Sequence, residues 1–192
     1  DVDVVRRHDG HVHEQDVVGA DGLARLVDGG LVAALLHPGV VPGPPGQLDR
    51  RARDHSGVIA AIASLAGAEA TDKAAAPANP VHILQIHGTE DGTIAYEGAD
   101  IRGNIYPGAV ETVERWAEYN GCATEGNVIG TLDLEKTLDG LDSTVTRYTS
   151  GCKLGGSAEL WTINGGSHVP QISDVFSEKV VEWLLAHPKV AM

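Results

Sequence analysis

Residues 82–91 read His82-Ile83-Leu84-Gln85-Ile86-His87-Gly88-Thr89-Glu90-Asp91. The Ile-rich run is bounded by Pro80 and Gly88, and this pattern predicts a short strand buried inside a sheet. Gly88 allows a sharp turn, so Asp91 is expected on the loop just past the carboxyl end of that strand. Ligands and catalytic groups collect at this edge of open α/β sheets. The stretch therefore predicts a functional carboxylate at Asp91.

A histidine loop follows a second predicted strand, residues 158–163, and places His168 within residues 164–170. A carboxylate beside such a histidine orients the imidazole and stabilises its charged form. An acid loop followed by a histidine loop is the order of the last two members of an α/β-hydrolase triad, Ser…Asp…His. We therefore predict Asp91 as the orienting acid and His168 as the general base.

Three segments together resemble the C-terminal half of secreted esterases related to polyhydroxybutyrate depolymerases and feruloyl esterases. They are Pro80–Asp91, the segment 115–122 that ends in Asn-Gly-Cys, and Trp161–Pro170. Those enzymes carry an H-G-T-x-D acid loop, a W-x-x-x-N-G-C segment and a G-G-x-H-x-x-P-like histidine loop. The likeness covers roughly residues 56–192, with one departure: the family usually has Trp before the Pro, whereas Val169-Pro170 is shorter.

The resemblance implies an α/β-hydrolase-type domain, apparently truncated, with a mostly parallel sheet flanked by helices. It implies carboxylic-ester hydrolysis without a cofactor, on a polyester or a plant cell-wall ester, in a secreted or periplasmic protein. An oxidising compartment favours a disulfide between Cys122 and Cys152 over two free buried thiols. Trp161 is expected either to pack inside or to line a substrate groove.

Residues 1–55 have an abnormal composition, because only ten residue types occur there and Ser, Thr, Cys and Lys are absent. Every one of these residues can be encoded by a codon that begins with G or C, and Ser56 is the first that cannot. In a GC-rich gene it is the third codon position that is nearly always G or C. We therefore hypothesise that residues 1–55 are read out of frame or from the opposite strand. This predicts a poorly ordered segment 1–55 and a genuine domain from 56 to 192.

No G-x-S-x-G nucleophile elbow occurs anywhere in the chain, so the nucleophile and the oxyanion hole stay unassigned. Ser56, Ser64 and Ser167 all lack that context. One alternative is a non-catalytic remnant of such an esterase. Another is a metallohydrolase whose N-terminal histidine cluster supplies the ligands His11, His13 and Asp16. The favoured interpretation includes no metal.

The net charge of −13 argues against nucleic acid or an anionic membrane as a partner, since both repel an acidic surface. No apolar run approaches the length of a membrane span. The remaining expected partner is the ester substrate.

Overall fold

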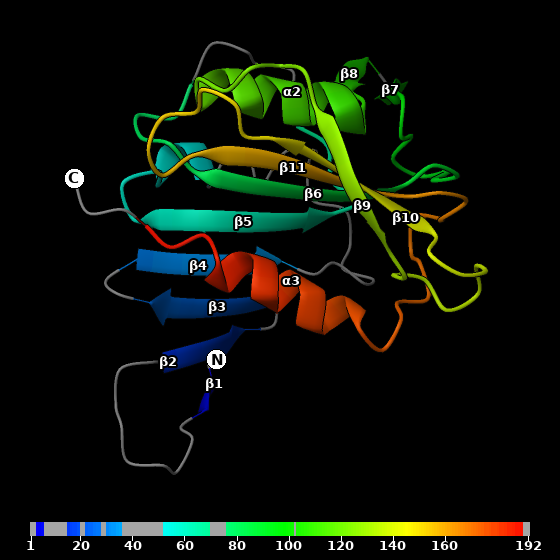
Figure 1. Ribbon diagram of the computed structural model, residues 1–192, viewed down its shortest axis with the longest axis horizontal. Coiled ribbons are helices and arrows are strands. Elements are labelled where there is room, and N and C mark those ends of the chain that lie inside the picture. Colours follow the sequence, from blue (N-terminus) through cyan, green and yellow to red (C-terminus); the bar gives the residue numbers. More distant parts are fainter. Residues whose placement is uncertain are drawn as a thin grey trace.

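A computed structural model describes residues 52–69, 76–101 and 103–189, together with four N-terminal strands. Nine strands form one sheet in the order β1-β2-β3-β4-β5-β6-β11-β10-β9, and β7 and β8 form a separate hairpin (Figure 1). The strands of the large sheet are β1 (Asp3–Val5), β2 (Gln15–Gly19), β3 (Gly22–Val27), β4 (Gly30–Leu35), β5 (Ile59–Leu65), β6 (His82–Gly88), β9 (Asn127–Leu132), β10 (Ser143–Tyr148) and β11 (Ser157–Ile163). The hairpin consists of β7 (Gly98–Ile101) and β8 (Asn104–Pro107).

The expected fold class, a mostly parallel α/β-hydrolase-type sheet flanked by helices, is wrong. Five of the eight strand pairings in the large sheet are antiparallel, and only the central ones, β4–β5, β5–β6 and β6–β11, are parallel. The described part of the chain contains two helices of ten or more residues, α2 (Ala109–Tyr119) and α3 (Phe176–Leu185). The sheet is therefore mixed, and these two described helices pack against its central strands.

The lengths of the connections explain two of the antiparallel pairs, β9–β10 and β10–β11. Residues 133–142 join β9 to β10, and residues 149–156 join β10 to β11. A parallel pair needs a crossover of about a dozen residues or more, whereas an antiparallel pair needs as few as two. Neither connection can hold a crossover helix, so the chain folds back on itself beside β11.

The three described central strands, β5, β6 and β11, are buried on both faces. This burial explains why the sequence of each is a nearly continuous apolar run rather than an alternating one. Alternate side chains enter two cores. Leu84 and Ile86 of β6 face the core that α3 covers, and Ile83 faces the core that α2 covers.

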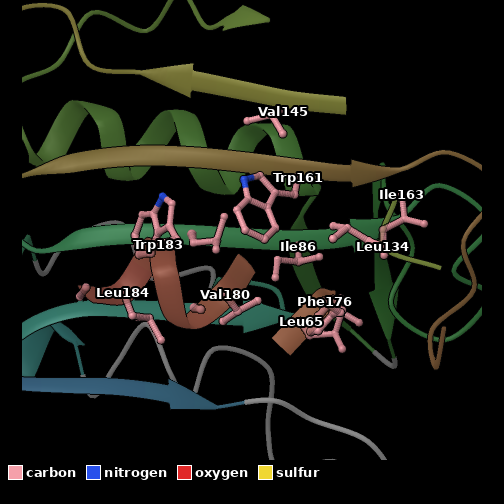
Figure 2. Close-up of a cluster of buried hydrophobic side chains, with 14 of the residues drawn as sticks. Leu65, Ile86, Leu134, Val145, Trp161, Ile163, Phe176, Val180, Trp183 and Leu184 are labelled. Atoms are coloured by element: carbon pink, nitrogen blue, oxygen red, sulfur yellow. The ribbon is translucent and has the colours of Figure 1, made fainter. Parts of the chain in front are cut away.

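Helix α3 closes the first core with one apolar stripe. Figure 2 shows Phe176, Val180 and Trp183 of this helix packed toward Leu65, Ile86 and Trp161 of the central strands. The spacing of these helical residues places them on one face of the helix. Helix α2 contributes Val113 and Trp116 to the second core, and Trp116 is fully buried.

Asn120, the C-cap of α2, ties this helix to the starts of β6 and β11. It is fully buried; its Oδ1 accepts from the Val81 amide at 3.1 Å, and its Nδ2 donates to Val81 O at 2.8 Å and to Ser157 O at 3.0 Å. Buried backbone groups need such partners. Asn120 thus fixes the starts of β6 and β11, and the candidate site lies where these two strands end.

The predicted disulfide between Cys122 and Cys152 is confirmed. It joins the end of α2 to the segment after β10.

Replacing both cysteines by alanine is expected to lower the free energy of unfolding by about 3.6 kcal/mol. The bridge closes a loop with a sequence separation of 30, and the chain-entropy model gives about this value for such a loop. Urea unfolding of the native and Cys122→Ala/Cys152→Ala chains measures the difference. Thiol titration of the unreduced, unfolded protein should find no free thiol, and two free thiols would contradict the bridge.

The hypothesis that residues 1–55 are out of frame and poorly ordered stays a prediction, because much of this segment lies outside the described residues. None of the described helices is both long enough and apolar enough to cross a membrane.

Candidate functional site

The site is built where β6 and β11 end. These neighbouring strands run parallel, and their register pairs Ser157 with His82 at one end and Ile163 with Gly88 at the other. Both strands therefore end at the same edge of the sheet and at the same level. The loop after β6 and the loop after β11 emerge side by side.

Hydrogen bonds join these two loops directly. The Thr89 amide donates to Ile163 O at 3.0 Å, and the Glu90 amide donates to Gly166 O at 2.9 Å. In return, the Gly165 amide donates to Thr89 Oγ1 at 2.8 Å. These hydrogen bonds set the relative position of the two loops independently of the Asp91 and His168 side chains.

Asp91 and His168 meet across this junction. His168 Nδ1 lies 2.9 Å from Asp91 Oδ2. The Asp91 side chain is completely buried, whereas 34% of the His168 side chain is exposed. Because the carboxylate accepts, His168 carries its hydrogen on Nδ1 when neutral, which leaves Nε2 as an acceptor. Among the described residues, Nε2 of His168 has no hydrogen-bond partner.

Burial opposes ionisation of Asp91, but hydrogen bonds to its carboxylate outweigh this effect and lower its pKa from 3.8 to about 2. The donors are the rings of His87 and His168 and the amides of Thr93 and Ile94. Both amides reach Oδ1 at 2.8 Å and close a turn around the side chain. Asp91 is thus a fixed anion beneath His168.

The depressed pKa of Asp91 predicts a loss of stability in acid. Its folded-state pKa lies below the unfolded value, so its contribution is present above the unfolded pKa and is lost as the pH falls through the folded one. We expect the difference in unfolding free energy between the native chain and Asp91→Asn to shrink by about 2 kcal/mol from about pH 5 to about pH 2. Urea unfolding at both pH values measures it, and a constant difference would contradict the assignment.

A second histidine, His87, also contacts Asp91, and the sequence argument did not identify it. Its Nε2 lies 3.1 Å from Asp91 Oδ2, and its side chain is 1% exposed. A sequence signal existed, because Gln85 and His87 are polar residues at alternate positions of an otherwise apolar strand. In a strand they share one face, and Gln85 Nε2 does lie 3.1 Å from His87 Nδ1.

Residues 133–142 form hydrogen bonds to the segment that follows His168, at Gln171. Glu135, which is buried, accepts from the Gln171 amide through Oε1 at 3.0 Å. The Lys136 amide donates to Gln171 O at 2.7 Å. Asp142 in turn accepts from the amides of Leu134 and Glu135. Glu135 and Asp142 therefore support the loop that carries His168.

No hydrogen bond joins His168 to the other described residues considered for the site, Trp161, Ser56 and Ser64. Trp161 is 4% exposed and packs in the α3 core, with its indole N–H donating to Glu159 at 2.7 Å. It packs inside rather than lining a groove. Ser56 and Ser64 are buried, and no described hydroxyl is hydrogen-bonded to His168.

The alternative metal site was expected at His11, His13 and Asp16. The two histidines lie outside the described residues, and Asp16 belongs to β2. Within the described part of the chain, no group of three or more His, Cys, Asp or Glu residues is arranged to hold a metal ion.

No model of a known protein family matches the chain, and neither does any curated protein or solved structure compared with it.

Proposed function

We propose that Asp91 and His168 are the acid and base of a carboxylic-ester hydrolase that works by a Ser-His-Asp mechanism. One observation carries the proposal: His168 Nδ1 lies 2.9 Å from a buried Asp91 carboxylate, while part of the imidazole is exposed. A buried anion that holds a partly exposed histidine in one tautomer is the arrangement that a triad requires. The resemblance of residues 56–192 to depolymerases and feruloyl esterases supports the same chemistry.

In this mechanism His168 Nε2 removes the proton of a serine hydroxyl as the serine attacks the ester carbonyl, and later returns it to the leaving alcohol. Asp91 stabilises the imidazolium that forms in between. Val169 and Ile172 follow the histidine in sequence, and their exposed side chains would contact an apolar part of the substrate. The disulfide supports a secreted or periplasmic location, since such bonds persist in oxidising compartments.

The nucleophile is the missing part. Residues 1–55 contain no Ser, Thr or Cys, and no described hydroxyl is bonded to His168. We propose that the serine is encoded in another frame of the DNA that specifies residues 1–55. A chain in which that frame, with its G-x-S-x-G motif, leads into Ser56 is called the frame-restored chain below.

Two measurements test the proposal. The DNA for residues 1–55 is read in all six frames for G-x-S-x-G, and the frame-restored chain is assayed with nitrophenyl acetate. We expect the motif to be present, the frame-restored chain to hydrolyse the ester, and the 192-residue chain to show only the background rate. If no frame contains the motif, the proposal fails and the chain is better described as a non-catalytic remnant. Turnover by the 192-residue chain that His168→Ala abolishes would show that one of its own hydroxyls is the nucleophile.

A further inference from the structure

The buried side of Asp91 contains a hydrogen-bonded series that the pair with His168 does not explain. It runs from Gly67 O through Gln85 and His87 to Asp91. We propose that His87 is a positioning residue, which holds Asp91 Oδ2 in the orientation that His168 needs. The inference rests on the proposed function for its catalytic meaning, but its hydrogen bonds can be tested without it.

The protonation of His87 follows from its neighbours. Gln85 Nε2 donates to Gly67 O at 2.7 Å and lies 3.1 Å from His87 Nδ1. An amide nitrogen donates and does not accept, so His87 Nδ1 must be the acceptor. The ring hydrogen is therefore on Nε2, which faces two acceptors, Asp91 Oδ2 at 3.1 Å and Ile94 O at 2.8 Å.

This hydrogen lets His87 hold both ends of the turn that surrounds Asp91. The Ile94 amide donates to Asp91 Oδ1 at 2.8 Å, while Ile94 O and Asp91 Oδ2 both face His87 Nε2. The His87 ring meets Tyr96 edge-on, with a centroid distance of 5.8 Å, and the Tyr96 hydroxyl is bonded to Thr162 at 2.9 Å. Tyr96 thus packs against the His87 ring, while Nε2 of the ring is bonded to the turn at Asp91 and Ile94.

A histidine is needed here for its donor and not for its volume. A leucine would fill a similar space, but it would leave Asp91 Oδ2 and Ile94 O without the Nε2–H. Asp91 Oδ2 would then keep only the His168 donor, and Ile94 O would lose the donor that it has at 2.8 Å. A carbonyl that loses its donor on burial is costly, so the turn from Asp91 to Ile94 would move or admit water. Either movement shifts the oxygen on which His168 depends.

The test is the tautomer of His168, observed by nitrogen-15 NMR of the imidazoles in the folded 192-residue chain. In the native chain we expect His168 in the Nδ1–H form and His87 in the Nε2–H form. His87→Leu should cause loss of the His168 Nδ1–H signal, whereas His87→Gln should retain it, because a glutamine amide can donate from nearly the same position. If His87→Leu does not fold, His87→Asn replaces it, since its shorter amide cannot reach Asp91.

The matched control is His82→Leu at the other end of the same strand, where the native ring contacts Ser157 instead of Asp91. It should leave the His168 signal unchanged. An unchanged signal in His87→Leu, or in His87→Asn where the leucine variant does not fold, would overturn the proposal and reduce His87 to a packing role.

In the frame-restored chain, His87→Leu should lower kcat on the order of 10²-fold with KM nearly unchanged, because a displaced base aligns poorly with the reacting atoms. If His87→Leu loses the His168 Nδ1–H signal but the frame-restored chain has no esterase activity, the positioning role stands and only the proposed function is refuted. An unchanged kcat in an active enzyme would refute the positioning role alone.

Discussion

Replacing His168 by alanine or Asp91 by asparagine in the frame-restored chain is expected to lower kcat for ester hydrolysis by about 10⁴-fold. His168→Ala removes the base that accepts the serine proton. Asp91→Asn replaces an anion bonded to His168 Nδ1 at 2.9 Å by an amide, which no longer fixes the tautomer or stabilises the imidazolium. Steady-state kinetics with nitrophenyl acetate measures both effects.

The same two substitutions in the 192-residue chain are the control, because this chain should hydrolyse nitrophenyl acetate only at the background rate with or without them. Triad members act as a unit, so a base and an acid without a nucleophile give little catalysis. The double variant of the frame-restored chain should be about as slow as either single one. A loss of less than about tenfold would show that the Asp91–His168 pair does not carry the reaction.

Gly88→Ala should cost about 4 kcal/mol of stability, above the usual range for an added methyl group because the obstacle is backbone. A Cβ atom at Gly88 would lie 2.1 Å from Gly166 O and 2.4 Å from Gly166 C. Neither atom can move without displacing the loop that carries His168. We therefore expect both a lower urea midpoint and loss of the His168 Nδ1–H signal.

Gly92→Ala is the matched control, four residues further along the same chain segment. A Cβ atom there would meet nothing within 4 Å, so the change should stay within about 0.5 kcal/mol of the native stability. Equal stability of the two variants would mean that the close approach of the loops at Gly88 is not structurally required.

The direction of the outer strands could not be predicted from the sequence. The patterns of the run between Pro80 and Gly88 and of residues 158–163 predict strands, and both strands lie in the parallel centre of the sheet. The segments beside them have similar strand patterns, but their connections decide their direction. Residues 127–132 form an edge strand because they pair with β10.

Local sequence determined the parts of this protein that depend on near neighbours. It placed the strand before Asp91 and the glycine turn at Gly88, because periodicity and backbone freedom act over a few residues. Only the tertiary structure decided that Trp161 packs inside, that the sheet is mixed, and that His87 shares the Asp91 carboxylate with His168. The meeting of Asp91 with His168 depends on strand pairing between residues 70 or more positions apart, and the sequence of neither strand specifies the register that brings the two loops together.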